Sequence, residues 1–428
     1  MLTREAIKVY HSKLDMVRDI PRIGIELELF CIDNTTLKTV PYQAADGHLS
    51  MQTLFEYLKV HEGYVEAGPA KTFMLKKDGS KLSLEPGAQL EFCSTPYADP
   101  EALLYEFWAY CAVLKRLSSR FNISWLDISY FPVGDSADVA LLPSARCEII
   151  DRYWQHTGKL GRDLMRYTTS LHLSFDYDTP LDLAKKVERA LFLKPIFLFL
   201  SASSRIRQGK DTGYRSFRTM IYKDTDMPRT GTPGSESLWS SGQWRLNDYI
   251  EKVLKAPAIF AMGTSTYTEA AHKPFEEYLN DADFDDYLSH LATIYTDIRV
   301  RQYLEVRYLD NPGIRLLPGI ILLFYSLFYD DAVWNDFEGR MPYTFQEVPR
   351  ITELLNTASD ASNSYWEREL LTPMTEFLSA LQARIPSAWS EHLEVVSERI
   401  VNYKKHDVLP DTMSEKDIIA YFKSSFPF

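Results

Sequence analysis

The chain has 428 residues, which is long enough for one large domain or two ordinary ones. Its 45% hydrophobic and 13% aromatic content indicates a packed globule and excludes general disorder. A net charge of −12, from 47 basic and 59 acidic residues, argues against broad binding to nucleic acid or to anionic membranes.

The amino-terminal stretch predicts a cytoplasmic protein. Residues 2–19 suit an amphipathic helix, are charged throughout and lack the apolar core of a signal peptide. The longest apolar stretch, residues 319–329, is too short to span a bilayer. The cysteines lack zinc-type spacing, so we expect free, mostly buried thiols, with a disulfide or redox switch as the alternative. They are Cys31, Cys93, Cys111 and Cys147.

The amino-terminal half mixes predicted strands and helices. A first strand covers residues 22–32. A later strand is interrupted at Pro86 and Gly87, where a bulge or tight turn would expose backbone N–H groups beside Glu85 and Glu91. The other elements expected here are a helix over 51–60, a hairpin of 72–77 with 81–85 around Asp78 and Gly79, a core helix over 100–120 and a buried strand over 125–130.

Further helices are predicted between residue 144 and the end of the chain. Asp411 or Ser414 is expected to cap the last helix, because short polar side chains favour that position. No internal repeat and no linker interrupts the chain. The expected elements are a helix or loop over 144–167, a long apolar helix over 181–200, a partly helical stretch over 236–254 and a predominantly helical region from 316 onward.

Four stretches place polar side chains at even spacing, so in each stretch they share one face of a predicted strand. Burying unpaired charge costs several kcal/mol per ion, and hard divalent cations such as Mg²⁺ would neutralise it with oxygen ligands. The alternative is a set of solvated edge strands. The stretches are RIGIELELF with Glu26 and Glu28, SLEPGAQLEF with Glu85, Gln89 and Glu91, TTSLHLSFDY with Ser170, His172, Ser174 and Asp176, and YLEVRYLD with Glu305 and Arg307.

Residues 201–234 form a basic stretch in a background of Gly, Ser and Thr. Such a loop can hold an anion through guanidinium groups and free backbone N–H groups, although it could also be a merely solvated loop. Together with clustered carboxylates it indicates metal-assisted binding of a polyphosphate. A glycosidase would need no such loop, and a zinc hydrolase would need more histidines. Walker and Rossmann glycine motifs are absent from the sequence. The basic residues are Arg205, Arg207, Lys210, Arg215, Arg218 and Arg229.

Five motifs in this order resemble the glutamate–cysteine ligase and carboxylate–amine ligase family of the glutamine-synthetase-like superfamily. The resemblance implies an α+β fold, with an antiparallel sheet forming an open funnel packed with helices. It covers residues 22–315 of a single catalytic domain over 1–428, whose helical subregion is 316–428. The motifs are GIELELF, EPGAQLEF, TSLHLSFD, SASSRIRQGKDTGYRSFRTMIY and DIRVRQYLEVRYLD.

The resemblance also implies roles for individual residues. Gln89 would point toward the acid substrate or a metal-bound water, and Lys210 would help to bind substrate or ATP. Two departures stand out: the usual PGGQ is PGAQ at Ala88, and the common SANSPFWQG is SASSRIRQG. The implied metal ligands are Glu26, Glu28, Glu85, Glu91, His172 and Glu305. The implied phosphate-binding and catalytic arginines are Arg207, Arg215, Arg218 and Arg307.

The expected function is that of an ATP-dependent ligase that joins the γ-carboxylate of L-glutamate to an amine, most plausibly that of L-cysteine, through an acyl phosphate. Two or three Mg²⁺ or Mn²⁺ ions are the expected cofactors. Partners would be small molecules and further copies of the chain, with no nucleic acid and no membrane. The alternatives are a ligase of the same fold with another amine or acid, and a non-catalytic ATP-binding descendant.

Overall fold

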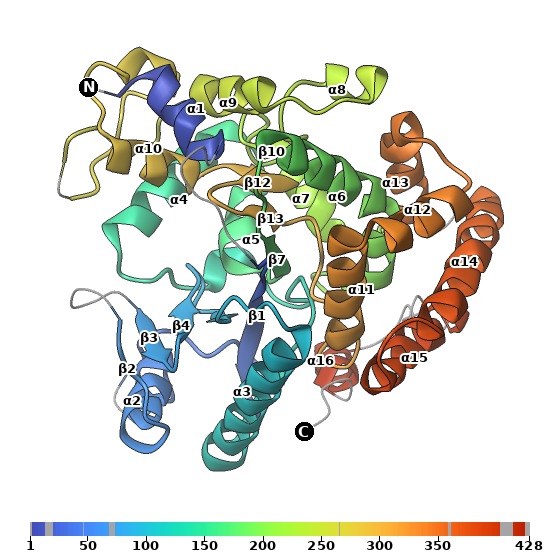
Figure 1. Ribbon diagram of the computed structural model, residues 1–428. Helices are drawn as coiled ribbons and strands as arrows, with labels where there is room; N and C mark the ends of the chain where they lie inside the picture. The colour runs from blue at the N-terminus through green and yellow to red at the C-terminus, as the bar shows by residue number, and fades with distance from the viewer. Residues whose placement is uncertain are drawn as a thin grey trace.

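An antiparallel sheet forms the centre of the molecule and helices surround it (Figure 1). The computed structural model describes residues 2–12, 20–45, 47–67, 73–264, 266–357, 361–402 and 414–423. In this part of the chain, nine strands join one sheet in the order β12-β13-β7-β1-β5-β4-β3-β2, and β6 pairs with the second half of β1. The strands are β1 Ile23–Asp33, β2 Val65–Glu66, β3 Met74–Lys77, β4 Ser80–Leu84, β5 Leu90–Cys93, β6 Ile123–Leu126, β7 Leu171–Phe175, β12 Ile298–Val300 and β13 Leu304–Val306.

Strand β1 organises this sheet, because β5, β6 and β7 all pair with it. Its alternating sequence puts Ile25, Leu27 and Leu29 into the hydrophobic core and leaves Glu26 and Glu28 on the opposite face. The four predicted polar stretches all contain strands of this sheet, so that prediction is confirmed. The second stretch supplies two strands, β4 and β5, which are joined by a turn over residues 85–89.

Helices cover the sheet along both halves of the chain. Helix α3 starts where Asp99 accepts a hydrogen bond from the Glu101 amide and Pro100 takes the first turn, and it ends at left-handed Asn122. The helices are α1 Arg4–Ser12, α2 Met51–His61, α3 Pro100–Phe121, α4 Ala145–Thr157, α5 Gly161–Arg166, α6 Pro180–Ser201, α7 Phe217–Lys223, α8 Ser237–Ser241, α9 Leu246–Lys255, α10 Phe284–Leu291, α11 Leu317–Tyr329, α12 Asp331–Arg340, α13 Val348–Asn356, α14 Ala361–Gln382, α15 Ser387–Val401 and α16 Glu415–Lys423.

The predicted elements agree with the observed ones in kind, and most differences lie at their ends. The hairpin around Asp78 and Gly79 forms as β3 and β4, and both turn residues have the positive φ that such a hairpin needs. The buried strand is shorter than predicted and ends at Leu126. The basic stretch was predicted as a loop but contains α7, the pair of short strands β8 Ile206–Arg207 and β9 Lys210–Asp211, and the short strand β10 Thr230–Gly231. Ser414 caps α16, while residues 13–19 and Asp411 lie outside the described residues.

The carboxy-terminal helices α11 to α15 gather on one side of the molecule, whereas α2 and the β3–β4 hairpin lie on the other (Figure 1). Helix α11 is buried and reaches the sheet, because Phe324 and Phe328 stack on Phe175 of β7. Among the described residues, no single helix is long and apolar enough to cross a membrane, although the bent pair of α11 and α12 passes that test together. All four cysteines are free, as predicted.

Candidate active site

A cavity of about 620 Å³ lies over the polar face of the sheet. The register of the strands brings the polar residues together: Glu28 of β1 is opposite Glu91 of β5, and Glu26 is opposite His172 of β7. One wall of the cavity carries carboxylate groups from β1, the β4–β5 turn and β5. The other wall carries guanidinium groups from the β12–β13 hairpin and the end of β13. The charged lining residues are Glu26, Glu28, Glu85, Glu91, Arg146, Arg299, Arg301 and Arg307.

The carboxylates of Glu28, Glu85 and Glu91 form a compact cluster. One oxygen atom from each lies within 4.8 Å of the others. Burial, followed by the charge of Glu91, raises the pKa of Glu28 to about 8. Burial and neighbouring glutamates likewise raise the pKa values of Glu85 and Glu91 to about 8. The donor set is all oxygen and crowded with like charge, so it fits a hard divalent cation such as Mg²⁺.

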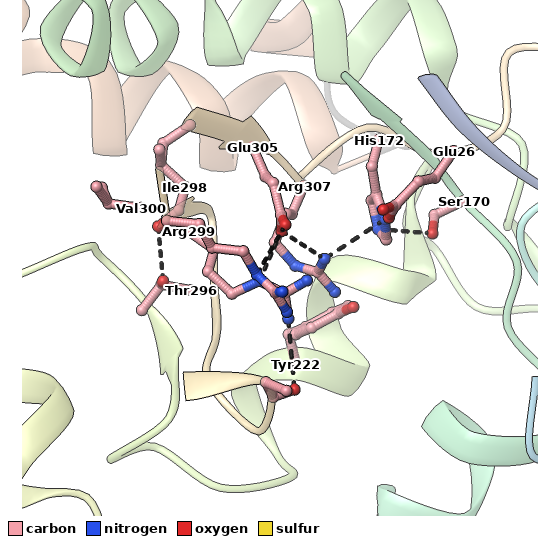
Figure 2. Close-up of polar contacts among 12 residues, drawn as sticks. Glu26, Ser170, His172, Tyr222, Thr296, Ile298, Arg299, Val300, Glu305 and Arg307 are labelled. Carbon is pink, nitrogen blue, oxygen red and sulfur yellow. Dashed lines mark hydrogen bonds and ion pairs between the residues drawn. The ribbon is translucent and has the colours of Figure 1, made fainter. Parts of the chain in front are cut away.

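His172 stands between the carboxylate wall and the arginine wall (Figure 2). Its Nδ1 lies 3.0 Å from Glu26 Oε2, and its Nε2 lies 2.9 Å from Ser170 Oγ. Burial, followed by the charge of Arg307, lowers the pKa of His172 well below its ordinary value. The imidazole is therefore neutral at physiological pH, and neutral imidazole is the form that binds metal ions.

Glu305 is completely buried among three arginines (Figure 2). It accepts from Arg299 Nε at 2.6 Å and Arg307 Nη1 at 3.2 Å, and its other oxygen lies 3.1 Å from Arg301 Nε. Burial acts to raise the pKa of Glu305, but these arginines outweigh it and hold the pKa below its ordinary value. Glu305 belongs to neither group of described side chains that could hold a metal ion, so its role as a metal ligand stays a prediction.

The arginines of the basic stretch make contacts away from the carboxylate cluster. Arg218 is buried and donates to the backbone carbonyls of Arg307 and Leu309 at 3.2 and 3.1 Å, which holds the end of β13 in place. Arg215 donates to the carbonyl of Leu355 at 2.6 Å, beside α13. Neither residue lines the main cavity, so their predicted catalytic roles stay predictions.

Two further basic residues of that stretch lie farther out. Arg207 pairs with Asp163 at 3.0 Å and packs over the ring of Phe217. Lys210 is exposed on the two-residue strand β9, Lys210–Asp211. The predicted substrate-binding and ATP-binding roles of both side chains stay predictions.

Gln89 and its turn close the cavity near β5. The Gln89 side-chain amide donates to the carbonyls of Thr168 at 2.9 Å and Met165 at 3.3 Å, while its buried side-chain oxygen has no partner among the described residues. A side chain at Gly87 would collide with the Arg166 backbone, since a Cβ there would lie 2.7 Å from the carbonyl oxygen. Ala88 adopts a φ of 67°, a left-handed conformation that favours glycine.

Arg146, Arg299 and Arg301 were not singled out from the sequence. Arg146, from the first turn of α4, stacks on Phe260 and Tyr267, with Cζ 5.4 and 5.8 Å from the ring centroids. It forms no ion pair with any described residue, although it lines the cavity. Arg299 and Arg301 lie in the motif DIRVRQYLEVRYLD, at even spacing from Glu305 and Arg307. That shared spacing was the available signal.

A second cavity of about 420 Å³ adjoins the first. Tyr222, Tyr295 and Arg307 line both cavities, so they separate the two spaces. The second cavity carries more basic than acidic side chains, because Glu236 and Asp297 are joined in its lining by Lys194, Arg218, Lys223, Lys252 and Arg307. The site as a whole therefore offers acidic side chains for a cation next to several basic side chains for anions.

Comparison with known proteins agrees with this geometry. The chloroplastic glutamate–cysteine ligase of Arabidopsis thaliana is 29% identical over 364 residues, which cover 83% of this chain and 67% of that protein. The corresponding protein of Brassica juncea is 29% identical over 342 residues, covering 78% and 65%. The chain thus spans about two thirds of the length of these relatives.

Two solved structures share the fold. The glutamate–cysteine ligase of Francisella tularensis, solved in complex with AMP, superposes with a TM-score of 0.50 at 11% identity, covering 96% of this chain and 89% of that one. A bifunctional glutathione synthetase from Pasteurella multocida gives a TM-score of 0.50 at 13% identity, covering 95% and 52%. These matches confirm the predicted α+β fold with a central antiparallel sheet. The model of glutamate-cysteine ligase family 2 matches residues 22–398, most of the chain, so the protein belongs to that family.

Proposed function

We propose that the protein is an ATP-dependent ligase that joins the γ-carboxylate of L-glutamate to the amine of L-cysteine. One observation carries the proposal: a single cavity brings the buried carboxylate of Glu28 and the half-buried carboxylates of Glu85 and Glu91 within reach of Arg299 and Arg307. Nucleotide-driven ligation needs this combination, because a cation and fixed guanidinium groups must together neutralise transferring phosphate. Family membership supports the same reaction.

The reaction proceeds in two steps. A γ-carboxylate oxygen of glutamate attacks the γ-phosphorus of ATP, the bond from that phosphorus to ADP breaks, and γ-glutamyl phosphate forms. The amine nitrogen then attacks the acyl carbon. The bond from that carbon to the phosphate oxygen breaks, phosphate leaves with the electron pair, and the nitrogen loses a proton. Activation is necessary because a free carboxylate is a poor electrophile. No nucleophilic side chain takes part, so the protein acts through binding, orientation and charge.

The protein's own residues divide this work by charge. Glu28, Glu85 and Glu91 would hold a divalent cation, Mg²⁺ or Mn²⁺, which when bound neutralises phosphate charge. Two or three such ions fit the number of carboxylates. Arg299 and Arg307 are held in fixed orientation by Glu305 and offer donors that need no reorganisation. Arg146 forms no ion pair with a carboxylate in the described part of the chain and is suited to bind one carboxylate of a substrate.

The decisive experiment supplies purified protein with ATP, Mg²⁺, glutamate and cysteine. We expect ADP and phosphate to appear only when both amino acids are present, together with a product whose mass is that of the γ-glutamyl dipeptide. The variant Glu85→Gln should lose this activity, while the exposed Glu353→Gln should retain it, because Glu353 pairs with Lys223 at the surface. Failure to turn over with any member of an amino-acid panel would overturn the proposal.

Two alternatives have distinct outcomes in the same assay. A ligase for another amine would release phosphate with a different member of the amine panel and give a product of different mass. A non-catalytic descendant would bind ATP without any amine-dependent hydrolysis. The cytoplasmic location and the assembly into homo-oligomers, both expected from the sequence, stay predictions.

A further inference from the structure

A sulfur atom stands at the edge of the carboxylate cluster. Cys93, the last residue of β5, lies directly opposite Glu26 of β1 and shares a strand face with Glu91. Residues opposed in this way have Cβ atoms about 4.5–5.5 Å apart. The Cys93 sulfur and one carboxylate oxygen from each of the two glutamates all lie within 4.8 Å of one another.

Cys93 differs from the other cysteines in its surroundings. Cys31, Cys111 and Cys147 belong to the hydrophobic core, where a thiol acts as a small apolar group. Cys93 is half-buried and lies outside that core. On β4, the strand on its other side, Ser83 donates to the Glu91 carboxylate. Packing therefore does not account for the thiol, whereas its position beside two carboxylates suits metal binding.

We propose that Glu26, Glu91 and Cys93 form a site for a thiophilic divalent cation such as Zn²⁺ or Co²⁺. Thiolate sulfur is a soft ligand that favours these ions over Mg²⁺, which prefers oxygen. Glu91 also belongs to the all-oxygen cluster with Glu28 and Glu85. A cation at the sulfur site therefore takes one ligand from the oxygen site, so thiophilic ions and Mg²⁺ compete. The inference rests on the proposed metal site but not on ligase turnover.

Cobalt titration of the full-length protein tests the site directly, because a cobalt–thiolate bond gives a charge-transfer absorption that oxygen ligands do not give. We expect this band in the unaltered protein and in Cys147→Ser, because Cys147 lines the active-site cavity but lies outside the ligand group. In Cys93→Ser the band should vanish and the Co²⁺ affinity should fall at least about tenfold. Loss of a side chain that only supports a metal ligand already lowers metal affinity by about this factor. The Mg²⁺ affinity of Cys93→Ser, measured by calorimetry, should stay unchanged.

A second measurement needs no variant and so does not depend on how well Cys93→Ser folds. Zn²⁺ should protect Cys93 of the unaltered protein from alkylation, as followed by peptide mass spectrometry, while excess Mg²⁺ alone should not. Absence of the cobalt band, a band that persists without Cys93, or equal alkylation with and without Zn²⁺ would each overturn the inference. If Mg²⁺ still binds in those cases, the proposed ligase site stands; if Mg²⁺ also fails to bind, both fail.

Discussion

Arg146 shows how a single residue of the cavity can be tested against a close neighbour. Its guanidinium is held by two aromatic rings and pairs with no described carboxylate. If it binds a substrate carboxylate, Arg146→Met should raise the KM of one amino acid by about 30-fold, equivalent to about 2 kcal/mol. Initial rates at varied glutamate and cysteine would identify which one. Arg152→Met is the control, since Arg152 lies on the same helix but pairs with Glu269 at the surface; an equal effect there would contradict the role.

Ala88 carries backbone strain that glycine would relieve. A left-handed φ costs an L-residue about 1–2 kcal/mol, which glycine would not incur. Part of the stability gained is lost because glycine makes the unfolded chain more flexible. Ala88→Gly should therefore raise the free energy of unfolding by about 0.5–1 kcal/mol, measured by urea denaturation. Ala109→Gly, on the exposed face of α3, should lower it by about 1 kcal/mol. A loss of stability in Ala88→Gly would show that the turn is not strained.

Glu305 offers a test of structural against metal-binding roles. Removing its charge leaves buried Arg299 and Arg307 without their counter-ion, which typically costs about 3–5 kcal/mol. We expect Glu305→Gln to lose stability of this order in chelator and in excess Mg²⁺ alike. A loss that appears only with Mg²⁺ present would instead identify Glu305 as a metal ligand, as the sequence resemblance implies.

At the scale of elements, the cluster between β1, the β4–β5 turn and β5 predicts an unusual pH dependence. Its carboxyl groups have pKa values of about 8 in the fold against 4.5 ordinarily, so the folded state holds extra protons between these values. The contribution of these protonated carboxyl groups to the free energy of unfolding is complete below about pH 4.5 and is lost as the pH rises through 8. In chelator, the melting temperature should therefore fall from pH 5 to pH 8 more steeply than in Glu91→Gln.

Added Mg²⁺ should reverse that fall, because it replaces the lost protons as the neutralising charge. The effect should be largest at pH 8 and small at pH 5, where protons compete with the cation. Scanning fluorimetry at four pH values, with and without Mg²⁺, measures both trends. Equal slopes for the unaltered protein and Glu91→Gln would contradict the assignment of the shift to this cluster.

The sequence predicted the strands well because the alternation of polar and apolar residues is a local property. It placed Glu26, Glu28, Glu85, Glu91 and His172 on one sheet face, and the structure brings them together. Pairing register is not local, and it is register that sets Arg299 opposite Glu305. Besides the Tyr222 hydroxyl, Arg218 donates to backbone carbonyls, which every residue carries, so the composition of the basic stretch could not reveal those carbonyl partners.

At the scale of the whole molecule, the helical carboxy-terminal region is part of the same core as the sheet. Phe328 stacks on Phe175 of β7 with ring centroids 4.2 Å apart, and Ile320, Leu323 and Leu327 are completely buried. A chain ending at residue 315 should therefore fail to give a cooperative thermal transition by circular dichroism. A folded, cooperatively melting fragment would contradict the prediction of a single domain.

The rim of the cavity and its floor come from different kinds of structure. The floor charges stand on hydrogen-bonded strands, in a turn between strands or just past a strand end, whereas Arg146 and Tyr267 come from the start of a helix and from a connecting segment. Substitutions at the rim leave the hydrogen bonds between the strands intact. Substitutions on the floor remove charges that interact with neighbouring charged side chains. Engineering of the accepted amine is therefore best begun with libraries confined to the rim, where side-chain variety can be explored with the phosphate-handling groups unchanged.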